Sequence, residues 1–108
     1  MFKEHCKLVR DRIPEIIKES GDKPKFIVLT RDARYYEEVK KKIAEEAREL
    51  CSAERKEEVV DEIVDIQELI DILLAALGMT KSELRTLQRK KNKERGGFKN
   101  RIFLMWTE

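Results

Sequence analysis

Two pairs of carboxylates at helical spacing are the residues of this chain best suited to do chemistry. The first pair is Glu46 and Glu49, and the second is Glu62 and Asp65. Residues three apart lie on nearly the same face of a helix, so each pair aims two carboxylates in one direction. If the two helices fold back on each other, the four carboxylates meet in one volume, where they repel unless a cation neutralises them. Oxygen ligands of this kind suit Mg²⁺ or Mn²⁺.

The position of these acids beside apolar residues favours a site over a solvated surface. On a helical wheel Glu46 falls about 60° from Ile43, next to the apolar stripe. Glu62 and Asp65 share a face with Leu69, so that face is acidic in one half and apolar in the other. The alternative is that the four carboxylates only solvate exposed helix faces, as most helical carboxylates do.

The other residues and motifs of the chain limit which metal the site could hold and how phosphate could bind there. His5 is the only histidine, and no Glu-x-x-His pair of the kind used by di-iron helical bundles is present. The sequence has neither the GxxxxGK[ST] nor the GxGxxG phosphate motif. Magnesium held by protein carboxylates usually works together with substrate phosphates, so phosphate charge has to be met by the metal and by basic side chains.

Charge is segregated along the chain although its sum is nearly zero. The 108 residues carry 24 Lys and Arg against 22 Asp and Glu, for a formal net charge of +2. Between residues 45 and 71 eleven acids face three bases, whereas between residues 88 and 101 seven bases face one acid. The balance excludes a uniformly basic nucleic-acid binder. The basic segment can supply charge for phosphates, or it can be a solvated helix end favoured by the helix dipole.

Long helices must position the carboxylates. Between residues 32 and 95 there is no proline, and the only glycine is Gly78. Apolar residues at helical spacing predict one helix through residues 36–50. A second helix is predicted from about residue 54 to 77, with Ser52 as its N-cap and Gly78 as its end.

Shorter elements complete the prediction. A third helix is expected to begin at the capping box opened by Thr80 and to stop at Gly96. Proline at the start of residues 14–19 favours a short helix there. The apolar runs at 26–29 and 102–106 are rich in β-branched or aromatic residues, so either is expected to be extended or strand-like, and the two could pair.

The sequence therefore predicts an all-α fold in one domain, residues 1–108. We expect an antiparallel helical bundle that is completed by oligomerisation, because residues 63–77 are apolar nearly all round and three helices of one chain cannot cover them.

No membrane association is expected, since the longest apolar stretch, Ile72–Leu77, is far shorter than the roughly 18 residues that span a bilayer. The first seven residues lack an apolar signal-peptide core. Cys6 and Cys51 have no CxxC spacing, which favours a reducing, cytoplasmic location.

Three motifs together resemble one protein family. The letters EEARE at residues 45–49 and EIVD at 62–65 resemble the EExxE…ExxD motif of the MazG-like, all-α nucleoside triphosphate pyrophosphatase superfamily. The run KLVRDRIP at residues 7–14 looks like the opening motif of its phosphoribosyl-ATP pyrophosphohydrolase-like, house-cleaning branch. The run KNKERGGF at 91–98 looks like the closing motif of that branch. The three motifs occur in order over nearly the whole chain.

The resemblance implies Mg²⁺-dependent hydrolysis between the α and β phosphates of a nucleoside triphosphate, giving a nucleoside monophosphate and pyrophosphate. It implies four metal ligands: Glu46, Glu49, Glu62 and Asp65. Glu45 would position the attacking water or act as a base. Four cations would bind the triphosphate or hold the two chain ends together: Lys7, Arg10, Lys91 and Arg95. The family also points to homodimers or homotetramers.

The rival hypothesis is a non-catalytic helical binding module that uses its basic C-terminal segment on nucleic acid or on a partner helix. Aromatic residues make up only 6% of the chain, which leaves few side chains for base stacking. With the balanced charge, this scarcity argues against nucleic acid as the partner, whereas the family resemblance implies a nucleoside triphosphate substrate.

Overall fold

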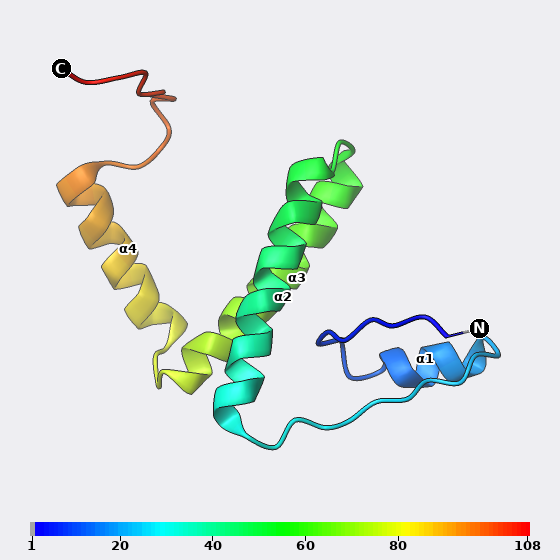
Figure 1. The fold of residues 1–108 in the computed structure, drawn as a ribbon. Coiled ribbons are helices and arrows are strands. Elements are labelled where there is room, and N and C mark those ends of the chain that lie inside the picture. The colour runs from blue at the N-terminus through cyan, green and yellow to red at the C-terminus, as the bar shows by residue number, and fades with distance from the viewer. Residues whose placement is uncertain (1) are drawn as a thin grey trace. The chain divides into compact units, whose positions relative to one another are not determined.

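The chain folds into α-helices and the segments that join them. The structure, a computed structural model, describes residues 2–108 and contains four helices and no strand within that range (Figure 1). The helices are α1 (Ile13–Glu19), α2 (Asp32–Ser52), α3 (Lys56–Ala76) and α4 (Lys81–Arg95). The prediction of an all-α protein is confirmed. The chain divides into two compact units, one ending at Leu73 and the other running from Leu74 to Glu108.

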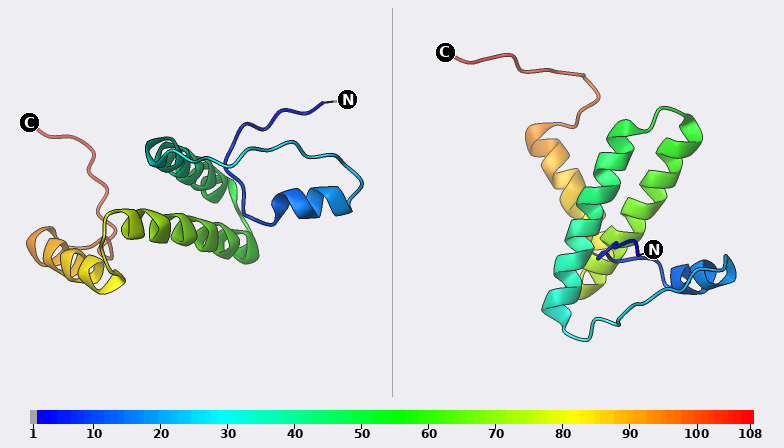
Figure 2. Two further views of the ribbon diagram at one scale, coloured as in Figure 1. Left: turned by 90° about the horizontal axis from the view of Figure 1, so that it is seen from below. Right: turned by 45° about the vertical axis from the view of Figure 1, so that its right-hand side comes forward.

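A hairpin of α2 and α3 forms the centre of the first unit. The two helices lie side by side and run in opposite directions, joined by residues 53–55 (Figures 1 and 2). A link this short leaves antiparallel packing as the simplest arrangement for two long helices. The second half of α2 therefore lies beside the first half of α3, and these halves carry the two predicted carboxylate pairs.

The turn of the hairpin corrects one prediction. Ser52 is the last residue of α2 and does not cap α3, because its hydroxyl donates to the carbonyl oxygen of Arg48 at 3.3 Å, one turn back in its own helix. A serine hydroxyl that bonds back in this way continues a helix instead of starting the next one. The following residue, Ala53, takes an extended conformation and ends α2.

The apolar core is small. Among residues 2–108 the buried hydrophobic side chains are Val39, which is completely buried, and Leu69 in the first unit, and Leu74 in the second. Burying one Val or Leu side chain contributes about 1.5–3 kcal/mol, so this core stabilises the fold only modestly. One face of α3 leaves three apolar side chains about half exposed: Val60, Ile63 and Val64.

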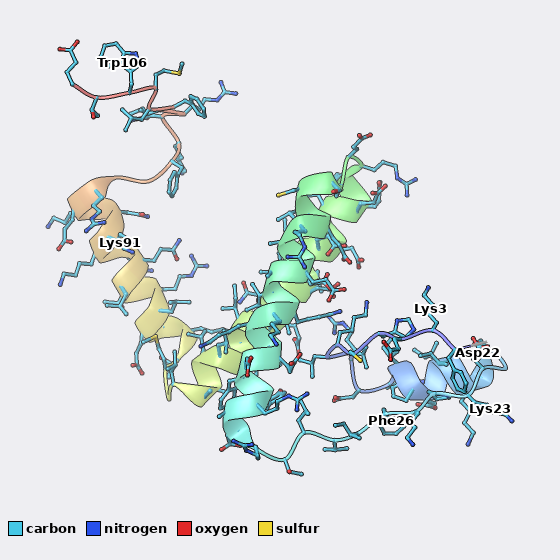
Figure 3. The ribbon with its side chains drawn as sticks, viewed as in Figure 1. Lys3, Asp22, Lys23, Phe26, Lys91 and Trp106 are labelled. Carbon is cyan, nitrogen blue, oxygen red and sulfur yellow. The ribbon has the colours of Figure 1, made fainter. Side chains whose placement is uncertain are left out.

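The N-terminal part of the first unit consists of α1 and two irregular segments. Proline stands in the first turn of α1, as predicted, and Gly21 after the helix has a φ of +100°, a conformation that favours glycine. The run at residues 26–29 is not a strand; Phe26, Ile27 and Val28 are exposed, and Phe26 is seen on the segment between α1 and α2 (Figure 3).

The second unit begins with the last residues of α3, from Leu74, and contains α4 and the C-terminal segment. Thr80 caps α4 as predicted, since its Oγ1 accepts a hydrogen bond from the backbone N–H of Glu83 at 3.0 Å. The helix stops at Gly96, whose φ of +82° suits glycine. The run at residues 102–106 is not a strand, and its side chains, including Trp106, are exposed (Figure 3). A strand needs a neighbouring strand for its hydrogen bonds, and residues 2–108 contain none.

None of the helices in the described range combines the length and the apolar character that crossing a bilayer requires.

Candidate metal centre

The hairpin of α2 and α3 brings the predicted metal ligands together. Ligand oxygens of Glu46 on α2 and of Glu62 and Asp65 on α3 lie within 4.8 Å of one another. A second group, formed by Glu45, Glu46 and Glu49 along α2, meets the same limit. Glu46 belongs to both groups and is the point where they join. We refer to these five carboxylates as the carboxylate cluster.

Glu46 is the buried member of the carboxylate cluster. It is only 5% exposed, and it is the only buried charged residue of the part of the chain that the structure describes. Burial raises the pKa of Glu46 to about 7, helped by the close approach of the Glu62 carboxylate and by the negative charges of Glu62 and Asp65. Burial and the charge of Glu46 likewise raise the pKa of Glu49. Without a cation, the carboxylate cluster is therefore harder to ionise fully than the same glutamates would be in water.

Two carboxylate oxygens of the cluster are buried without a partner. Within residues 2–108, neither Oε2 of Glu46 nor Oε2 of Glu62 receives a hydrogen bond. A buried polar atom without a partner is costly, and the cost is larger for a charged group. A cation between these oxygens would remove that cost. The donor set consists of hard carboxylate oxygens alone, which fits Mg²⁺ or Mn²⁺.

Lys42 is a member of the site that the sequence analysis missed. Its Nζ donates to Oε2 of Glu45 at 3.1 Å and lies 3.4 Å from Oε1 of Glu46, and its side chain is only 16% exposed. Burial lowers the pKa of Lys42, but the hydrogen bonds and charges of the two glutamates outweigh burial and raise it. The sequence does indicate this contact through its spacing, because Lys42 precedes the two glutamates by three and four residues on one helix.

Glu45 lies at the edge of the cluster and is held by two ammonium groups. Its Oε1 accepts from Nζ of Lys7 at 3.0 Å, and its Oε2 accepts from Lys42. Partial burial raises the pKa of Glu45, but the hydrogen bonds from the two lysines outweigh it and bring the pKa below its ordinary value. Glu45 is therefore ionised, and a water molecule has to compete with a lysine to reach it.

The N-terminal cations contact the carboxylates of the hairpin. Arg10 donates from Nη2 to Oδ1 of Asp65 at 2.6 Å, and Lys7 reaches Glu45 as described above. Hydrogen bonding to Asp65, together with nearby acidic charge, raises the pKa of Arg10 against the effect of burial. The prediction gave both residues either to phosphate or to holding the chain ends together. In this structure each is paired with an acid of the hairpin.

The remaining predicted phosphate ligands lie in the second unit. Lys91 and Arg95 are exposed on the last turns of α4, and the side chain of Lys91 extends from that helix (Figure 3). Their role toward phosphate stays a prediction.

A depression of about 250 Å³ opens beside the cluster at the turn of the hairpin. Its lining residues are Glu49, Ser52, Ala53, Glu58, Asp61 and Glu62. Four of these six are acidic, so a bare triphosphate is repelled there. The depression suits a cation first, and a polyphosphate only when cations accompany it.

The fold and the site define an all-α protein whose helical hairpin carries a carboxylate cluster fit for a divalent cation. Comparison of the chain with protein-family models, with curated proteins and with solved structures gives no match. The functional assignment therefore rests on the motifs of the sequence and on the chemistry of the cluster.

Proposed function

We propose that this protein is a Mg²⁺-dependent nucleoside triphosphate pyrophosphohydrolase, which cleaves the α–β phosphoanhydride to give a nucleoside monophosphate and pyrophosphate. The observation that carries the proposal is the buried, unpartnered Oε2 of Glu46 among the other carboxylates of the hairpin. Hard cations such as Mg²⁺ prefer oxygen ligands, so a cluster made only of carboxylates suits a hard cation. The resemblance of its spacing, and of the two terminal motifs, to the MazG-like superfamily supplies the reaction.

In this proposal each part of the site has one task. Four carboxylates hold the cation: Glu46, Glu49, Glu62 and Asp65. When bound, the cation neutralises phosphate charge and makes a bound water more acidic. Glu45 is kept ionised by its lysine partners, which is the state needed to orient that water and accept its proton. Lys7, Arg10, Lys91 and Arg95 provide positive charge for the triphosphate. Hydrolysis of this kind needs positioning and charge neutralisation more than a covalent intermediate.

The proposal includes a homodimer or homotetramer. Its support is the face of α3 on which Val60, Ile63 and Val64 are about half exposed, next to a core with few buried side chains. Covering these residues with the same face of a second copy would add the apolar burial that one chain lacks. We also propose a cytoplasmic location, in agreement with two exposed cysteines that are not joined in a disulfide.

The test is release of pyrophosphate from a panel of nucleoside and deoxynucleoside triphosphates with Mg²⁺. The double variant Glu49→Gln, Asp65→Asn should lose at least about 100-fold in kcat/KM, because it removes two of the four ligands. The control variant Glu37→Gln, Glu57→Gln removes the same charge from exposed positions of α2 and α3 and should keep full activity.

Three results would count against the proposal. Inorganic phosphate as the product would exclude α–β cleavage. Normal turnover by the double variant would remove the cluster from the mechanism. No hydrolysis, together with salt-sensitive binding of nucleic acid through Lys90, Lys91 and Lys93, would favour the rival binding module.

A further inference from the structure

Two cations of the N-terminal segment connect it to both helices of the hairpin. Lys7 reaches Glu45 on α2, 38 residues away in sequence, and Arg10 reaches Asp65 on α3, 55 residues away. The two apolar residues between them, 8 and 9, are half-buried. We call residues 7–10 the N-terminal clamp. Its first residue, Lys7, contacts α2, and its last residue, Arg10, contacts α3.

The clamp engages a carboxylate that a divalent cation would use. Asp65 belongs to the group of ligand oxygens that includes buried Glu46 and Glu62, and its Oδ1 already accepts from Arg10 at 2.6 Å. A cation bound by this group would lie within a few ångströms of the guanidinium. Two positive charges at that separation repel, and they compete for the same negative charge.

We propose that the N-terminal clamp is the counter-charge of the metal-free site, and that Mg²⁺ binding displaces Arg10 from Asp65 and frees its guanidinium for a phosphate group. The phosphate part of this inference rests on the proposed function. The Arg10 side chain is 56% exposed, so it can turn toward a ligand in solvent without breaking a packed core. A guanidinium also offers the paired N–H donors that match phosphate oxygens.

The clamp is expected to open at Arg10 and not at Lys7. Lys7 pairs with Glu45, whose second oxygen is already held by Lys42, and Glu45 does not belong to the group that contains Asp65. Of the two clamp cations, only Arg10 therefore competes directly with a cation among Glu46, Glu62 and Asp65; outside the clamp, Lys42 lies 3.4 Å from Oε1 of Glu46.

Calorimetric titration of the full chain with Mg²⁺ alone tests the competition. Arg10→Gln should bind Mg²⁺ about two- to fivefold more tightly than the wild type, the factor expected when a partly exposed ion pair no longer has to be broken. The matched control is Arg12→Gln, which removes an equal charge from an exposed pair with Glu15 and should bind Mg²⁺ as the wild type does. Equal or weaker Mg²⁺ binding by Arg10→Gln overturns the proposal.

Hydrogen exchange of the wild-type chain provides a test that needs no variant to fold. Addition of Mg²⁺ should speed solvent exchange of the guanidinium protons of Arg10, observed by NMR, because Asp65 holds this group in the metal-free chain. Slower exchange would mean that the metal tightens the pair, which overturns the proposal. With Mg²⁺ present, inorganic triphosphate should bind Arg10→Gln several-fold more weakly than the wild type. Equal binding overturns the transfer of Arg10 to phosphate.

The outcomes separate this inference from the proposed function. Opening of the clamp by Mg²⁺ without pyrophosphate release from any nucleotide would keep the inference and remove the function. Pyrophosphate release from a chain whose clamp stays closed would do the reverse.

Discussion

Replacing Glu46 by glutamine should stabilise the metal-free protein at high pH. The pKa of Glu46 is raised from 4.5 to about 7 in the folded chain. Below pH 4.5 Glu46 is protonated in both the folded and the unfolded chain, so its ionisation does not lower the stability of the fold. Between pH 4.5 and 7 the unfolded chain loses this proton while the folded chain keeps it, so stability falls as pH rises. At about 1.4 kcal/mol per pH unit, the full loss is about 3 kcal/mol.

Urea denaturation in the presence of EDTA measures this effect. At pH 8 we expect Glu46→Gln to exceed the wild type by about 3 kcal/mol in unfolding free energy, and at pH 5 by only about 1 kcal/mol. Glu37→Gln, at an exposed position of the same helix, should stay within about 0.5 kcal/mol of the wild type at both pH values. Mg²⁺ should stabilise the wild type at pH 8 but not Glu46→Gln. A glutamine variant that is less stable than the wild type at pH 8, or an equal difference at both pH values, would refute the reasoning.

Three further predictions concern Lys42, the apolar face of α3 and the cap of α4. Lys42→Met should lower the metal-free unfolding free energy at pH 8 by about 1–2 kcal/mol, because it leaves Glu46 without a cation and Glu45 with Lys7 alone. The exposed Lys40→Met is the control, and equal stability of the two variants would contradict the pairing. Ile63→Glu should shift light-scattering mass from an oligomer to a monomer, whereas Val28→Glu should not; a monomeric wild type at micromolar concentration would contradict the oligomer. Thr80→Ala should lower the stability of α4 by about 1 kcal/mol, seen as lost helicity in circular dichroism; unchanged helicity on heating would show that the cap contributes nothing.

Sequence patterns predicted the ends of a helix correctly where all the residues that determine an end are close together in the sequence. The capping box at Thr80 and the stop at Gly96 depend on neighbouring residues only, and both were predicted correctly. The helical spacing of the carboxylates was also sufficient to bring them together, because the short link between α2 and α3 leaves little freedom in how the helices pack.

The missed features depend on choices that the sequence leaves open. The Ser52 side chain can cap the next helix or form a hydrogen bond within its own helix, and in this structure it donates to the carbonyl oxygen of Arg48. Lys7 and Arg10 could serve phosphate or protein, and only the folded chain shows the acids that they meet across 38 and 55 residues. Lys42 was detectable in principle from its spacing to the glutamates on α2, but a lysine beside acids is so common on helices that the pattern alone does not single it out.

The placement of Glu46 is the strongest argument that the cluster has a use beyond solubility. Glu46 follows completely buried Val39 by seven residues on α2, so the two stand on the same face of the helix. A leucine at position 46 would extend a core that is short of apolar side chains, whereas the glutamate costs about 3 kcal/mol when ionised. A solvated acid would avoid this cost by pointing outward, and a purely structural acid would have both oxygens paired. Glu46 does neither, which supports the proposed cation: shared with Glu62 and Asp65, it would turn the cost into binding energy.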